Sequence, residues 1–321
     1  MQAPSTNWRE LIEADEGARH EAMSAVIAAV QRQNSAKFGA GRALHRKAVA
    51  SLRGSLQIRA DLPEAAAHGV FIAGKTYDVW ARLSNGGPDL KANTKPDIRG
   101  FALRLLDVHG EGALGGAIDH QDFLLINHDR FTSRTSDEFA GIVQAAAKSP
   151  LAVFVYLIRT HGWRGGFAQV KALTATIKKP FASFATEAFN TVLPHTVGPY
   201  AARIGLVPLQ ADAPLLRDIG EDIAARLAKG SVAYELTLQF FVDEKATPIE
   251  DPTVVWSTAA STPVVVGRVT FASQGVDAGF AEQVEKAKFD PWGGLAVHRP
   301  LGEIMRARKA AYFVSQKARG V

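Results

Sequence analysis

The stretch Tyr77-Asp-Val-Trp-Ala-Arg-Leu-Ser84 alternates apolar and polar side chains more clearly than any other part of the chain. Because successive side chains of a β-strand point to opposite faces, this alternation predicts a strand with one buried face. Other short runs rich in β-branched and aromatic residues, bounded by Gly, Pro, Asn and Asp, also predict strands. The predicted strands cover residues 55–60, 77–84, 99–107, 122–127, 232–243 and 263–271.

Helical patterns surround and interrupt these strands. Strands on both sides of a helical insertion favour an α+β fold whose sheet is completed by late strands. We therefore expect a single domain over residues 1–321, with an N-terminal helix at 1–35, a helical insertion at 136–230 and a C-terminal helix at 298–321. Within the insertion, the helical stretches fall near 137–148, 151–161, 167–178 and 213–229.

The composition excludes several classes of protein. None of the 321 residues is cysteine, which excludes disulfides, thiolate zinc sites, iron–sulfur clusters and cysteine nucleophiles. The formal charge of +5 is spread along the chain without a block of Lys and Arg, so we expect no nucleic-acid partner. No apolar run approaches the roughly eighteen residues that span a bilayer, and residues 1–10 do not resemble a secretory signal. We therefore expect a cytoplasmic protein without a membrane span.

Near the C-terminus, Arg308, Tyr312 and Arg319 follow one another at intervals of four and seven residues in a predicted helix. At about 100° per residue, all three side chains share one face of that helix. A guanidinium one turn from a phenol can donate to its oxygen and favour the phenolate, which is a hard anionic ligand for ferric iron. An arginine and a tyrosine at this spacing also form ordinary packed or solvated pairs.

Three polar residues stand near predicted strands. His45 ends Gly41-Arg-Ala-Leu-His45, Arg99 leads into an apolar strand, and Asn127 ends the run that begins at Asp122. Each has an ordinary alternative: a structural histidine, a surface arginine at a strand start, and a turn-forming asparagine. Taken singly, these positions do not define a function.

In their order along the chain, these motifs resemble the catalase superfamily, over roughly residues 40–140 and from about 230 to the end. The short, catalase-related (minimal catalase-like haem) proteins are more similar than full-length catalases, because Pro248-Ile-Glu-Asp-Pro252 and the stretch Phe289–Gly302 look like their signatures. The other matching motifs are Arg42-x-x-His45, Ala81-Arg-Leu-Ser84, Asp97-Ile-Arg-Gly-Phe-Ala102, Asn127 with Phe131, Arg134 and Phe139, and Arg308-x-x-x-Tyr312 with Arg319.

The resemblance implies an antiparallel β-barrel core with surrounding helices and a b-type haem. Tyr312 would be the proximal iron ligand on the C-terminal helix, and Arg308 would keep it deprotonated. On the distal side, the resemblance implies His45 as general acid–base, Asn127 as hydrogen-bond donor to the peroxide and Ser84 as the residue that orients His45. The remaining implied haem contacts are Phe139 against a haem face, and Arg42, Arg99 and Arg319 on the two propionates.

The implied function is a haem-dependent peroxidase or hydroperoxide-processing oxidoreductase, which cleaves the peroxide O–O bond heterolytically. The chain does not contain the N-terminal arm, wrapping segment and C-terminal domain of full catalases, which predicts a wider entrance. We therefore expect the protein to process a small peroxide or a lipid hydroperoxide, and we do not expect efficient dismutation of hydrogen peroxide. The motifs leave open whether the protein is a homo-oligomer.

Two alternatives remain open at this stage. The family's His-Ala-Lys-Gly is here His45-Arg-Lys-Ala48, its Thr-Pro is His128-Asp129, and its second Phe is Thr132. These departures are compatible with a haem or lipophilic-ligand binding protein without turnover. The other alternative is a non-haem metalloenzyme, whose ligands would be Asp119, His120, Asp122, His128 and Asp129.

Overall fold

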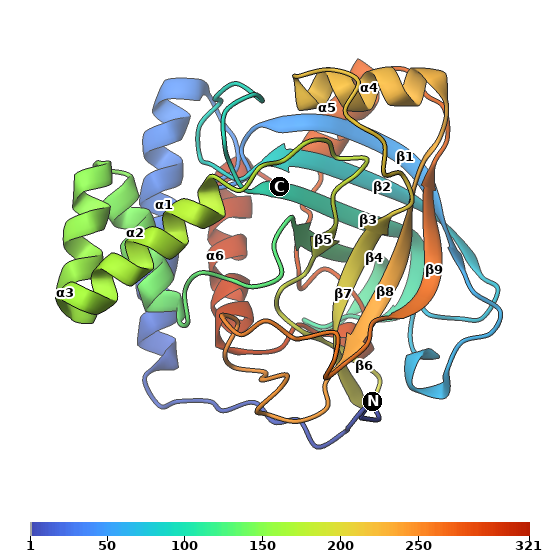
Figure 1. The fold of residues 1–321 in the computed structure, drawn as a ribbon, viewed down its shortest axis with the longest axis horizontal. Helices are drawn as coiled ribbons and strands as arrows, with labels where there is room; N and C mark the ends of the chain where they lie inside the picture. Colours follow the sequence, from blue (N-terminus) through green and yellow to red (C-terminus); the bar gives the residue numbers. More distant parts are fainter. Residues whose placement is uncertain (1) are drawn as a thin grey trace.

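Eight antiparallel strands close into a barrel in the computed structural model, which describes residues 2–321 (Figure 1). The strand order is β5-β4-β3-β2-β1-β9-β8-β7, a pairing of β5 with β7 closes the ring, and β6 extends the sheet beyond β7. The strand bounds are β1 Ala48–Ile58, β2 Thr76–Asn85, β3 Arg99–Glu111, β4 Ala117–Ile126, β5 Phe189–Asn190, β6 His195–Val197, β7 Tyr200–Pro208, β8 Val232–Phe240 and β9 Val264–Phe271.

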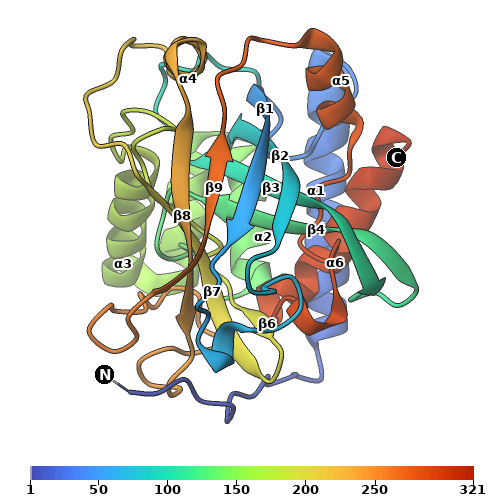
Figure 2. The ribbon, with the colours of Figure 1, turned by 90° about the vertical axis from the view of Figure 1, so that its right-hand side faces the viewer.

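The helices lie outside the barrel. Helices α1, α2 and α6 pack against one another on one side of it, and α3 lies beyond α2 (Figures 1 and 2). The α-helix bounds are α1 Glu16–Phe38, α2 Ser136–Ala146, α3 Pro150–Ile177, α4 Ile219–Lys229, α5 Ala278–Lys286 and α6 Glu303–Arg319. Among residues 2–321, no helix has the length and apolar character needed to cross a membrane.

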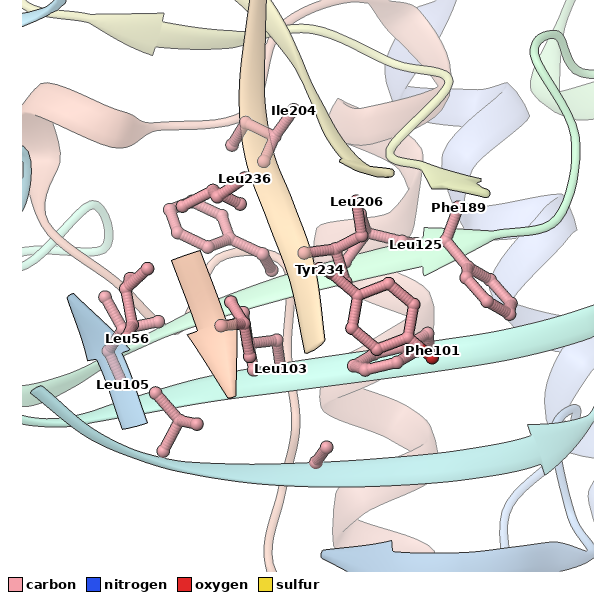
Figure 3. Packing of buried hydrophobic residues seen from close by; sticks show 14 of the residues in the cluster. Leu56, Phe101, Leu103, Leu105, Leu125, Phe189, Ile204, Leu206, Tyr234 and Leu236 are labelled. Carbon is pink, nitrogen blue, oxygen red and sulfur yellow. The ribbon is translucent and has the colours of Figure 1, made fainter. Parts of the chain in front are cut away.

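The barrel interior is filled by side chains from its strands. Phe101, Leu103 and Tyr234 are among its fully buried residues, and Figure 3 shows them packed against neighbouring strands. Phe101 contacts Tyr234 edge-to-face, with 5.4 Å between ring centroids. Because the interior is filled in this way, a ligand pocket has to lie between the barrel wall and the helices.

The predicted insertion at 136–230 is wrong as a purely helical segment, because strands β5, β6 and β7 lie within it. Strand β7 runs through six consecutive buried residues, so the alternation that reveals a half-buried strand is missing from its sequence. The two helices predicted at 151–161 and 167–178 form α3, which Gly162 interrupts with a φ of 69°.

The terminal helices are shorter than predicted. Helix α1 begins at Glu16 and not within residues 1–10, because the preceding segment is held against the rest of the chain. The Trp8 indole donates to the Pro199 carbonyl at 2.9 Å, and the Glu10 carboxylate accepts from Arg299 at 2.7 Å. Helix α6 begins at Glu303 and not at residue 298, because Gly302 before it has a φ of 92°.

Candidate functional site

A pocket lies between the outer face of β2–β4 and helices α1, α2 and α6. It holds about 1230 Å³ of space not filled by protein atoms, its open mouth included. Seven of the nine predicted site residues line it. These are Arg42, His45, Ser84, Phe139, Arg308, Tyr312 and Arg319.

Strand register builds one wall of the pocket. Ser84 pairs with Gly100 and Gly100 with Ile126, so these three residues form a row across β2, β3 and β4. Arg82 pairs with Ala102 in the next row on the same face, because side chains on a strand return to one face every second residue. All five line the pocket, while the intervening side chains point into the barrel.

The imidazole of His45 is fixed against this wall. Its Nδ1 lies 3.0 Å from the Ser84 hydroxyl, and its backbone N–H donates to the Gly86 carbonyl at 2.9 Å. A β-carbon at position 100 would fall 2.7 Å from Ser84 Oγ and closer still to His45 Nδ1. Only glycine at position 100 therefore leaves room for the pair.

Burial lowers the pKa of His45 to about 3, and the positive charges of Arg82, Arg308 and Arg42 act in the same direction. The ring is therefore neutral at physiological pH. With Nδ1 at the serine, Nε2 is the nitrogen that can exchange a proton with a ligand.

Arg308 and Tyr312 face the same pocket from α6. A guanidinium N–H of Arg308 donates to the Tyr312 phenol oxygen at 2.9 Å, as their spacing of four residues predicts. Tyr312 therefore lines the pocket with a guanidinium beside its phenol oxygen.

Three arginines gather around Glu285 of α5 at one end of the pocket. Arg42 forms an ion pair with its carboxylate, Arg82 Nε donates to the same carboxylate at 2.9 Å, and Arg319 donates to its backbone carbonyl at 3.1 Å. Burial lowers the pKa of Arg42 to about 9, which still leaves it charged at neutral pH. Three cations and one carboxylate leave a net charge of +2, which suits a ligand with two carboxylates.

Arg82 is a site residue that the sequence reasoning missed. It is almost fully buried, lines the pocket and lies two residues before Ser84 on the same strand. The alternation in Tyr77–Ser84 carried the signal, because residues 82 and 84 of one strand share a face.

Arg99 and Asn127 are not among the pocket-lining residues of the described chain, 2–321. The Arg99 guanidinium donates to the carbonyls of Asn93 at 3.0 Å and Lys95 at 2.6 Å, and also to the Asn85 side chain. The structure therefore does not bring Arg99 to the site where a propionate role was expected.

Asn127 directly follows β4, is buried and has a fixed orientation. Its Oδ1 accepts the backbone N–H of Arg99 at 2.8 Å, while its buried Nδ2 has no hydrogen-bond partner within residues 2–321. A buried donor without a partner is costly, which is consistent with a group kept for a ligand.

The departure at Arg46 does not place a cation beside His45. The Arg46 guanidinium turns back to the carbonyls of Gly39 and Arg42, and its own carbonyl accepts from Arg82 at 3.2 Å. Arg46 is buried there and does not line the pocket.

The residues considered for a non-haem metal do not form a site. Asp122 accepts two hydrogen bonds of 2.7 Å from Arg104, and His120 lies 2.7 Å from Asp119. No group of three or more His, Asp or Glu side chains that could hold a metal ion occurs in residues 2–321.

Comparison with solved structures shows that the chain has a catalase-like fold, an α+β barrel with surrounding helices. A fungal catalase matches with a TM-score of 0.70 and 20% identity, over 87% of this chain and 59% of its own. Catalase A from Saccharomyces cerevisiae matches with a TM-score of 0.69 and 18% identity, over 87% and 61%. A bacterial catalase matches with a TM-score of 0.69 and 18% identity, over 99% and 63%.

The chain therefore spans about three fifths of the length of these catalases. Neither a protein-family model nor a curated protein sequence matches it. The fold expected from the sequence motifs is confirmed, since the barrel, the surrounding helices and the C-terminal helix are all present.

Proposed function

We propose that this protein is a haem-dependent peroxidase that acts on hydroperoxides. The observation that carries the proposal is that two matched pairs, His45 with Ser84 and Tyr312 with Arg308, line one pocket. Peroxide cleavage by haem needs an acid–base group, which a neutral histidine can be. It also needs an iron ligand, which a tyrosine that accepts a hydrogen bond from an arginine can be.

The residues present fit a haem of the b type. Tyr312 would ligate its iron, Phe139 would contact its face, and the arginines around Glu285 would hold its two propionates, with Arg42, Arg82 and Arg319 as the donors. When bound, haem would supply the two electrons that break the peroxide O–O bond.

His45 would move the proton in this reaction. Because it is neutral, it can take the proton from the inner peroxide oxygen and return it to the departing one, while Ser84 keeps the ring in place. Arg308 would donate to the phenol oxygen of Tyr312 at the opposite side of the pocket.

The lining favours an organic hydroperoxide as substrate. Besides the polar pairs, the pocket is walled by apolar side chains from α1, α6 and the segment before β6, among them Met23, Ile27, Leu193 and Ile304. Apolar walls stabilise the hydrocarbon part of such a molecule and give little to hydrogen peroxide.

An absorption spectrum of the purified protein supplied with haem tests the cofactor and its ligand. We expect a ferric haem spectrum in the wild type and in Tyr200→Phe, a control tyrosine outside the pocket. Tyr312→Phe should lose or strongly shift that spectrum. A spectrum unchanged by Tyr312→Phe would remove the ligand assignment.

The role of His45 is tested at equal haem occupancy. We expect His45→Ala to slow hydroperoxide consumption by about 10²–10⁴-fold, the range typical of general acid–base catalysis. An exposed histidine changed in the same way, His109→Ala, should leave the rate near wild type. Equal rates for His45→Ala and wild type would remove the acid–base assignment, and no consumption by either protein would favour a ligand-binding protein without turnover.

A further inference from the structure

Helix α3 and the segments on either side of it contain basic residues but no acidic ones. Between Phe139 and Thr186 the chain contains no Asp or Glu, although charged residues of both signs occur elsewhere along it. The cations of this stretch are Lys148, Arg159, Arg164, Lys171, Lys178 and Lys179.

The same helix exposes large apolar side chains. Of its 28 residues, only Leu157 and Gly166 are buried. Trp163 keeps 67% of its surface exposed and Phe167 keeps 46%, which is unusual for aromatic residues. The other exposed apolar residues of α3 are Leu151, Val155 and Ile177.

Gly162 divides α3 into two arms that pack against each other. Phe154 on the first arm contacts Phe167 on the second, with 5.4 Å between ring centroids. Trp163 contacts Phe167 at 5.1 Å. The pair of arms rests on α2 at the outside of the molecule (Figures 1 and 2).

Helix α2, on which α3 packs, has two carboxylates. Glu138 is buried, accepts the backbone N–H of Arg134 at 2.7 Å and lies 3.1 Å from His161. Asp137 is the other carboxylate of α2. These two carboxylates do not balance the six cations of the stretch, three of which lie on α3 itself: Arg159, Arg164 and Lys171.

We propose that α3 binds the surface of an anionic lipid bilayer. Exposed Trp and Phe side chains enter the boundary between headgroups and acyl chains, while lysines and arginines attract acidic headgroups. Since α3 is too polar to cross a membrane, it would lie in the plane of the surface.

Charge also argues against a second copy of the chain as the occupant of this face. A symmetric dimer across α3 would bring two identical sets of cations together. The stretch offers no carboxylate of its own to pair with them. An anionic surface, in contrast, complements both the charge and the apolar side chains.

Sedimentation of the full-length protein with vesicles tests the proposal. We expect binding to phosphatidylcholine vesicles that contain about 30% phosphatidylglycerol, and at least about tenfold weaker binding to phosphatidylcholine alone. Raising NaCl from about 0.05 to about 0.5 M should weaken the binding, because it shortens the screening length. Equal binding to both kinds of vesicle would overturn the assignment of an anionic partner.

Two double variants test the residues, each with a matched control. Trp163→Ala with Phe167→Ala removes apolar contact, and Arg164→Glu with Lys171→Glu reverses charge; each should reduce binding about tenfold or more. The controls change exposed residues elsewhere, namely Leu114→Ala with Val276→Ala and Lys229→Glu with Lys245→Glu. Controls that weaken binding as strongly as the α3 variants would contradict the proposal.

A spectroscopic measurement locates the contact without depending on stability. Brominated lipid should quench part of the tryptophan fluorescence of the wild type. In Trp163→Phe this quenching should fall while vesicle binding stays, because the remaining apolar ring still inserts.

Sedimentation velocity tests whether a second copy of the chain covers α3 instead. The proposal is overturned if the wild type does not bind vesicles but forms a dimer, and if Trp163→Ala with Phe167→Ala dissociates that dimer.

Discussion

His45 occupies a backbone conformation that most side chains avoid, with a φ of 49°. Backbone hydrogen bonds between residues 45–47 and 85–87 hold it there. His45 and Arg46 donate to the carbonyls of Gly86 and Gly87, and Asn85 donates back to Lys47 at 3.1 Å. A residue with a strained backbone is typical of a functional site, because the contacts around it offset the free-energy cost of the strain and fix the orientation of its side chain.

Gly100→Ala should disturb the arrangement of His45 and Ser84. The added carbon collides with Ser84 Oγ and His45 Nδ1, so we expect a loss of about 1–3 kcal/mol in the free energy of unfolding. The His45-dependent turnover should fall with it. Gly17→Ala is the control, since open space and a helical backbone predict a gain of about 0.5–1 kcal/mol. Urea unfolding measures both, and equal effects would contradict the clash.

At the scale of elements, α5 completes the pocket from a distance in sequence. Its Glu285 lies 243 residues from Arg42 and 203 from Arg82, yet both side chains contact its carboxylate. The carboxylate partly neutralises the arginines when the pocket has no anionic ligand. It also sets the charge that a ligand encounters.

Glu285→Gln should therefore destabilise the ligand-free protein. It leaves the buried Arg82 without its counter-charge, and because Glu285 is partly exposed we expect a loss of about 1–2 kcal/mol rather than the full cost of a buried pair. Haem binding should recover most of that loss, because its propionates supply new negative charge. Glu282→Gln on the same helix is the control, since its ion pair with Lys286 is exposed and screened by solvent, so this change should alter the stability far less. Thermal unfolding with and without haem measures these differences.

The elements also show where prediction from the sequence succeeds. The Arg308–Tyr312 contact was predictable, because helical spacing alone decides it. Glu285 was not, since no local pattern indicates which carboxylate a distant arginine contacts. Arg99 lies outside the pocket for the same reason: carbonyls of the loop before β3 accept hydrogen bonds from its guanidinium, and no local sequence pattern indicates these contacts.

At the scale of the whole molecule, four buried or half-buried histidines link the stability of the fold to pH. Burial lowers the pKa of His45 and His195 to about 3, and that of His128 and His298 to about 4. Each therefore binds a proton more readily in the unfolded chain, whose histidines titrate near 6.5. Between about pH 6.5 and 4, the unfolded state takes up more protons than the folded state, so the free energy of unfolding must fall as the pH falls.

His195 allows this linkage to be measured at one position. Its ring is fully buried, neither nitrogen has a hydrogen-bond partner within residues 2–321, and the charges of His298 and Arg308 add to burial in lowering its pKa. His195→Leu should therefore cost little at pH 7.5, because it removes two unpaired polar atoms. It should also reduce the loss of stability between pH 7.5 and 5 by on the order of 1–2 kcal/mol. Urea unfolding at both pH values measures this difference, and His109→Leu, at an exposed histidine, is the control. If the His195 variant loses as much stability on acidification as the wild type, His195 is not a neutral histidine of the folded state.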